Sequence, residues 1–151
     1  PPPPLQTGGR PPTRTAATTR PSRLGPKLSV TTGLAVAGSS RDPEVLTARY
    51  NDPLVHCLGT PRLATEATKA MLSCFENVDD LHIPILIIHG TSDRITSPQV
   101  SRDFFDRICH PDKKYIAYEG GYHESHNDLH HSQVTADIVN WLGDHLSKEN
   151  S

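Results

Sequence analysis

The sequence has 151 residues, the size of one domain and long enough to bury a core. Its 15 basic residues nearly balance its 17 acidic residues, so the charge does not indicate a nucleic-acid partner or an anionic membrane partner. No apolar run approaches the roughly 20 residues of a membrane-spanning helix. The three cysteines have no metal-site spacing and are odd in number, so we expect reduced, structural thiols at Cys57, Cys74 and Cys109.

Residues 1–27 are rich in proline, arginine and threonine, and we expect them to be disordered. Leu5 and Leu24 are their only large apolar residues, too few to offset the entropy cost of ordering the segment. Two other interpretations stay open: Pro1 to Pro4 form a polyproline ligand, or the stretch is foreign to the domain that follows. Because the sequence begins at Pro1 and its single methionine is Met71, we expect a fragment.

Residues 28–80 predict two helices. The first begins at Asp42, a typical capping residue, followed by Pro43 and Glu44 in the first turn. The second runs from Pro61 to Cys74 and has its apolar side chains on one face, the pattern of an amphipathic helix.

Residues 81–151 predict the order strand, helix, strand, helix. The run Ile83–Ile88 is continuously apolar, as in a strand buried on both faces of a parallel sheet, with Pro84 at its first ladder position. A helix from about Pro98 to Cys109 follows, then a strand at Tyr115–Tyr118 and a helix from about Ser132 to Leu146. This alternation indicates an α/β fold with a parallel sheet. Two strands do not make a stable sheet and the upstream helices offer no third, so we expect an incomplete sheet.

Two residues with catalytic chemistry follow the two strands. Asp93 lies in the loop after the first strand and His123 in the loop after the second. Because ligands and catalytic groups gather beyond the carboxyl ends of parallel strands, we expect these side chains to meet at one edge of the sheet. An acid followed by a histidine is the order that α/β-hydrolases use after their serine. His123 would act as general base, and Asp93 would orient its imidazole.

The segments around both residues resemble the end of the monoacylglycerol lipase, lysophospholipase and serine aminopeptidase-like family of α/β-hydrolases. Four segments agree in order and spacing: Ser40–Val45, Asn51–His56, Ile85–Ile95 and Tyr118–Asp128. The first two resemble the return of the family's lid to its core, so the resemblance implies that residues 28–80 are the end of a lid and its connecting helices. The resemblance covers about residues 28–146 and implies a carboxyl-terminal part of the α/β-hydrolase fold, with Asp93 and His123 as triad acid and base.

The sequence departs from this family at the nucleophile. The family's serine lies in a G-x-S-x-G turn upstream of the lid, and no serine here stands two positions before a glycine. Cys57-Leu-Gly59 is the nearest imitation, but Val55 replaces the first glycine and no predicted strand precedes it. We therefore predict no nucleophile in this chain and expect it to be inactive alone.

A histidine-rich stretch follows the predicted base and raises the alternative of a metal site. His126 and His130 are four apart, which suits two ligands on one helical face. However, His123 and His126 are one residue short of the H-E-x-x-H spacing of zinc proteases. We therefore predict no metal site, exposed side chains at His130 and His131, and a loop-ending or capping role for Asn127 and Asp128.

The resemblance implies a parent protein that hydrolyses a carboxylic ester, a monoacylglycerol or lysophospholipid, through an acyl-serine intermediate. It implies a small-molecule acyl ester as substrate, no cofactor, no nucleic acid, peripheral membrane contact through the lid, and a cytoplasmic or peripheral membrane location. Alternatives stay open: a peptidase or small-ester esterase of the same fold, a non-catalytic remnant or scaffold, or a chain that is complemented by a separate nucleophile half.

Overall fold

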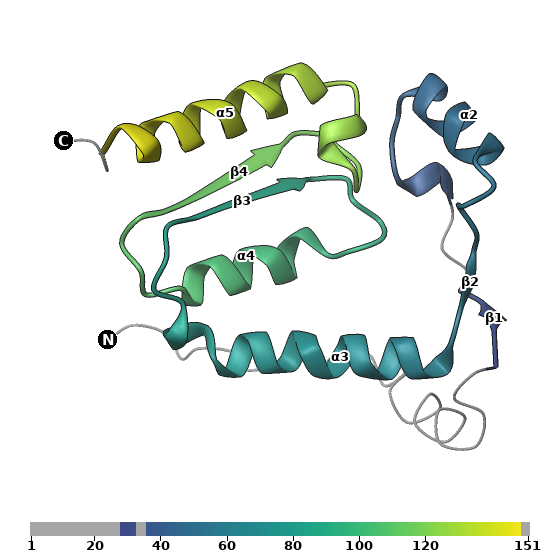
Figure 1. Ribbon diagram of the computed structural model, residues 1–151, viewed down its shortest axis with the longest axis horizontal. Coiled ribbons are helices and arrows are strands. Elements are labelled where there is room, and N and C mark those ends of the chain that lie inside the picture. The colour runs from purple at the N-terminus through teal and green to yellow at the C-terminus, as the bar shows by residue number, and fades with distance from the viewer. Residues whose placement is uncertain (1–27, 33–35, 149–151) are drawn as a thin grey trace, which may run out of the picture. The chain divides into compact units, whose positions relative to one another are not determined.

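The computed structural model describes residues 28–32 and 36–148, drawn as coloured ribbon in Figure 1. The described residues divide into two compact units: residues 28–32 with 58–72, and residues 36–57 with 73–148. The expectation of disorder for residues 1–27 falls outside the described residues.

The first unit contains a short ladder and most of a helix. Strand β1 (Val30–Thr31) pairs antiparallel with β2 (Leu58–Gly59), and α3 (Pro61–Glu76) follows. The hydroxyl of Thr60 accepts a hydrogen bond from the backbone N–H of Leu63 at 3.1 Å, which supports the start of α3. The predicted helix is confirmed. The two strands were not predicted, because two residues are too few to show an alternating pattern.

The second unit is built on two parallel strands. Strand β3 (Ile85–Gly90) pairs in parallel with β4 (Lys113–Tyr118), and α4 (Pro98–Arg107) connects them. The predicted strands, their direction and the helix between them are confirmed. The ladder starts two residues later than the apolar run, so Pro84 lies just before the strand, where its missing N–H costs no ladder bond.

Helices α4 and α5 (His131–Lys148) flank this strand pair (Figure 1). The first turn of α4 is capped by Ser97, whose hydroxyl accepts from the N–H of Val100. Two apolar side chains in the unit have almost no exposed surface: Ile108 directly after α4, and Val134 of α5. They mark the core beside the strands.

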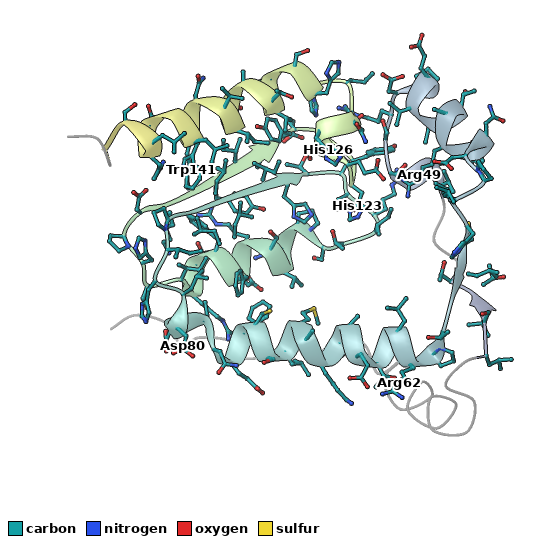
Figure 2. The ribbon with its side chains drawn as sticks, in the orientation of Figure 1. Arg49, Arg62, Asp80, His123, His126 and Trp141 are labelled. Carbon is teal, nitrogen blue, oxygen red and sulfur yellow. The ribbon has the colours of Figure 1, made fainter. Side chains whose placement is uncertain are left out.

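The expectation that β3 is buried on both faces is wrong for the described residues. Its side chains are half-buried, and only Gly90 is buried. An apolar groove runs between β3 and α5, and Figure 2 shows Trp141 of α5 on this side of the helix. The groove is lined by Pro84, Ile85, Leu86, Ile88, Ile138, Trp141 and Leu142. The described residues supply no third strand to this sheet, so the apolar run of β3 stays partly open.

The second unit also contains η1 (Val36–Gly38) and α2 (Pro43–Asn51), which precede the sheet in sequence. Asp42 caps α2 as predicted, because its carboxylate accepts from the N–H of Glu44 at 2.8 Å. Two short 3-10 helices complete the unit, η2 (Val78–Asp80) and η3 (Ser125–Asn127). In the part of the chain that the structure describes, none of the helices has the length and apolarity to cross a membrane.

Candidate active site

The candidate site lies at the carboxyl ends of β3 and β4. The loop after β3 is tied to the loop after β4 by backbone hydrogen bonds: Thr91 N–H donates to the carbonyl of Tyr118 at 3.0 Å, and Ser92 N–H donates to the carbonyl of Gly121 at 2.9 Å. These bonds fix the two loops side by side. Asp93 follows on the first loop and His123 on the second, so both predicted residues lie at the same edge of the sheet.

Close backbone approach between the two loops requires glycine. A Cβ atom on Gly90 would lie 2.3 Å from the carbonyl oxygen of Gly121, which no side chain can accommodate. Gly120 has φ = 67°, in the left-handed region that favours glycine. The Glu119-Gly120-Gly121 turn therefore lets the chain leave β4 and pass directly over the end of β3.

The carboxylate of Asp93 accepts five hydrogen bonds, and its side chain is only 2 % exposed. Its Oδ1 accepts from the backbone N–H groups of Ile95 at 2.7 Å and Thr96 at 3.0 Å. Its Oδ2 accepts from the Thr96 hydroxyl at 2.7 Å, from Nδ1 of His123 at 2.9 Å and from Nε2 of His89 at 3.1 Å. Burial disfavours the charge, but the bonds from His123, Thr96 and Ile95 outweigh burial and lower the pKa of Asp93 to about 2.

The imidazole of His123 is oriented by this carboxylate. With Nδ1 donating to Asp93, the neutral ring carries its proton on Nδ1 and has Nε2 as a hydrogen-bond acceptor. The side chain is 36 % exposed, so a hydroxyl group can approach it. Figure 2 shows His123 on the loop that leads from β4 toward α5. A histidine held this way can take a proton from a nucleophile.

Two side chains at the Asp93 carboxylate were missed by the sequence analysis. His89 is the last side chain of β3 before Gly90, and Thr96 stands three residues after Asp93. A short polar residue three positions after an aspartate in a turn could have indicated Thr96. For His89, the only feature of the sequence that could have indicated this contact was its position four residues before Asp93.

Two ion pairs connect the histidine loop to the segment around α2, and neither was predicted. The Nε of Arg41 lies 2.9 Å from Oδ2 of Asp128, whose side chain has no exposed surface. Arg49 of α2, labelled in Figure 2, pairs with Glu124 directly after the candidate base. Asp128 was expected to end the loop or cap the next helix. Its carboxylate instead accepts from Tyr122 and Arg41 as well as from Leu129.

The metal alternative gains no support. His126 lies in η3 and His130 just before α5, so the two do not share a helical face. No group of metal-ligating side chains is present among the described residues. His130 was expected to be exposed but is half-buried: Nη2 of Arg41 lies 2.9 Å from its Nε2, and its ring stacks on Tyr118 with centroids 5.6 Å apart. His131 is exposed, as expected.

All three cysteines of the chain are exposed thiols outside any disulfide. Cys57 directly precedes β2, so no strand leads into it as a strand leads into a serine elbow. The described geometry therefore gives no support to Cys57 as a nucleophile.

Known proteins resemble the chain over most of its length. The family described as Serine aminopeptidase, S33, matches residues 3–130, a range that includes most of the proline-rich stretch that the resemblance left out. A monoacylglycerol lipase of Mycolicibacterium smegmatis is 31 % identical over 128 residues, covering 82 % of this chain and 44 % of that protein. A caffeoylshikimate esterase of Arabidopsis thaliana is 29 % identical over 121 residues, covering 77 % of this chain and 36 % of that protein.

Among solved structures, the monoacylglycerol lipase of Paleococcus ferrophilus superposes with a TM-score of 0.83 at 30 % identity, covering 90 % of this chain and 53 % of that chain. The chain thus spans about half the length of these two monoacylglycerol lipases and 36 % of the esterase. The matched range and this superposition identify the chain as a member of the Serine aminopeptidase, S33, family, with part of an α/β-hydrolase fold.

Proposed function

We propose that Asp93 and His123 are the acid and base of a Ser-Asp-His triad that hydrolyses carboxylic esters. The observation that carries this proposal is the 2.9 Å contact between Nδ1 of His123 and Oδ2 of a buried, ionised Asp93. It gives the imidazole one orientation and one tautomer, which is what a triad acid does.

The serine must come from outside this sequence, which contains no G-x-S-x-G turn. We propose that the part of the relatives that this chain does not span supplies it. In the reaction, Nε2 of His123 takes the proton of the serine hydroxyl as its oxygen attacks the ester carbonyl. The histidine then gives that proton to the alcohol as it leaves, and an acyl-serine forms. Water, deprotonated by the same nitrogen, then attacks the acyl carbon, and the serine oxygen leaves with the proton from His123 as the carboxylic acid is released.

For the substrate, we propose a monoacylglycerol or a lysophospholipid. Two relatives whose names specify monoacylglycerol lipases support this choice. The caffeoylshikimate esterase supports a second candidate, an esterase for small soluble esters. Peripheral membrane contact through the lid stays a prediction, as does the absence of cofactor and nucleic-acid partners.

The test begins with the reading frame upstream of Pro1. If it encodes a G-x-S-x-G turn, the continuous protein is expressed and assayed with a long-chain monoacylglycerol, a lysophospholipid and a short-chain soluble ester. Preference for the first two, with labelling of the serine by a fluorophosphonate, supports the proposal. Preference for the short ester supports the second candidate. A frame without the turn, and no hydrolysis after mixing with a serine-bearing half, supports the non-catalytic alternative.

A further inference from the structure

We propose that the ion pair between Arg41 and Asp128 is a positioning unit for His123. It ties the loop that carries the base to the chain segment before α2. This inference rests on the proposed function, because it assigns a role to residues that act through the candidate base. Neither side chain has a hydrogen bond to His123, so both are positioning residues.

The carboxylate of Asp128 closes the loop that contains His123. Its Oδ2 accepts from the backbone N–H of Tyr122 at 2.8 Å, and its Oδ1 accepts from the backbone N–H of Leu129 at 2.9 Å. Tyr122 immediately precedes His123. One buried carboxylate therefore fixes the backbone at both ends of the loop. Burial disfavours its charge, but the bonds from Tyr122, Arg41 and Leu129 outweigh burial and keep its pKa below the usual value.

Arg41 supplies the charge that this carboxylate requires. Its backbone N–H donates to Oδ1 of Asp128 at 2.9 Å, and its Nε lies 3.1 Å from Oδ1 and 2.9 Å from Oδ2. The two residues are 87 apart in sequence. A buried carboxylate that loses its partner is strongly destabilised, so this pair differs from an exposed ion pair, which contributes little.

The residues around Arg41 add further ties to the same loop. The carbonyl of Ser39 accepts from the N–H of Glu124 at 2.8 Å, and the hydroxyl of Ser40 donates to the carbonyl of Asn127 at 2.7 Å. Both serines are buried. The segment 39–41 thus holds the histidine loop at several points on the carboxyl-terminal side of the base, and Arg41 is the one charged residue of this segment.

The consequence concerns the bond between His123 and Asp93. Asp93 is fixed by its own loop, through Ile95 and Thr96. The ring of His123 contacts Asp93 at 2.9 Å and the Thr96 hydroxyl at 3.3 Å, both on the other loop, so its position depends on the course of its own loop from Tyr122 to Asp128. Weakening the pair between Arg41 and Asp128 lets this loop move, and the histidine then spends less time bonded to Asp93.

The experiment follows the imidazole Nδ1–H resonance of His123 by NMR in the 151-residue chain, with Arg41→Gln, Arg41→Lys and Asp128→Asn. Backbone amide resonances of β3 and β4 report in the same samples whether the sheet stays folded. Arg102→Gln is the matched control, since Arg102 and Asp106 form an exposed pair at 3.1 Å within α4. Asp93→Asn is the reference variant that removes the bonded carboxylate itself.

We expect Arg41→Gln to abolish or broaden the Nδ1–H resonance while the β3 and β4 amides stay dispersed. Arg41→Lys should retain part of the Nδ1–H resonance, because the lysine ammonium keeps the charge but does not occupy the position of Nε. Arg102→Gln leaves it unchanged. If Asp128→Asn unfolds the sheet, the two Arg41 variants test the positioning role on their own. A resonance that persists in Arg41→Gln overturns the inference, whether or not that variant melts at a lower temperature.

The same spectra separate this inference from the proposed function. If Asp93→Asn abolishes the resonance and Arg41→Gln does not, only the positioning role fails. If Asp93→Asn leaves the resonance in place, the Asp93–His123 pair is absent in solution and the proposed function fails with it. In the continuous, serine-bearing protein, Arg41→Gln should lower kcat about 100-fold with little change in KM, the size expected for a displaced catalytic group. An unchanged kcat overturns the inference.

Discussion

His123 and Asp93 are 30 residues apart in sequence, yet Nδ1 of the histidine lies 2.9 Å from Oδ2 of the aspartate. The same carboxylate accepts four further hydrogen bonds, two of them from backbone N–H groups of its own loop. The position of the Asp93 carboxylate is therefore fixed by bonds other than the one to His123. This asymmetry, a rigid acid and a base on a loop tied by distant residues, gives different expectations for substitutions on the two sides.

Replacing Asp93 by asparagine should lower turnover of the serine-bearing protein about 10⁴-fold, by analogy with serine proteases. The amide removes the negative charge that stabilises the imidazolium and favours the wrong tautomer. Steady-state ester hydrolysis measures the loss, and thermal unfolding checks the fold. Asp106→Asn is the control, because Asp106 lies on α4 with 57 % of its side-chain surface exposed. A loss below tenfold in Asp93→Asn would remove Asp93 from the triad.

The lowered pKa of Asp93 predicts how the stability of the second unit depends on pH. Because the folded state favours the ionised carboxylate, folding is stabilised above the unfolded-state pKa of 3.8, and this contribution is lost as pH falls toward about 2. A shift of this size corresponds to about 2 kcal/mol. Urea unfolding between pH 2 and 6 measures it in the 151-residue chain.

Asp128 also has a lowered pKa, so it too stabilises the fold less as the pH falls. Because Asp128 is present in both the original chain and Asp93→Asn, its effect cancels in the difference, which isolates the contribution of Asp93. The stability difference between the original chain and Asp93→Asn should shrink as the pH falls below 4. A difference that stays constant across this range would contradict the assignment of the charge to Asp93.

The close approach of the two loops predicts a large effect at Gly90. In Gly90→Ala the new methyl group would overlap the Gly121 carbonyl, so the loops after β3 and β4 must separate, at a cost of about 2 kcal/mol or more. The His123 Nδ1–H resonance should also be lost. Gly143→Ala is the matched control: a Cβ there meets no atom within 4 Å, and alanine should stabilise helix α5 by about 0.5–1 kcal/mol. Equal unfolding midpoints for the two variants would contradict the close packing.

The sequence was informative where the pattern is local. The apolar run of β3 and the capping residues of α2 lie within a few positions of the elements they specify. The juxtaposition of Asp93 and His123 needed one further step, that neighbouring parallel strands end at a common edge. The strand boundary was misplaced by two residues, because Ile83 precedes a proline that cannot donate a ladder bond, and its side chain is 63 % exposed.

What could not be predicted depends on contacts between distant segments. Nothing near Arg41 indicates that its partner lies 87 residues later, and Asp128 has the same local signature as an ordinary capping residue. The half-burial of His130 follows from the same contact, because Arg41 and Tyr118 cover its ring. The exposure of β3 was predicted only in part: its apolar run indicated burial on both faces, whereas the expected lack of a third strand correctly indicated an incomplete sheet.

That open face leads to the last prediction. The groove between β3 and α5 exposes apolar side chains, and Leu142 retains 47 % of its surface. We therefore expect the 151-residue chain to bind an apolar fluorescent dye in the groove. The bound dye should quench the fluorescence of Trp141, the single tryptophan, or accept its energy. Leu142→Lys should weaken dye binding several-fold. Leu54→Lys, at a leucine that is 85 % exposed and outside the groove, should not. A sharp cooperative melt without dye binding would show that the chain covers this face in solution.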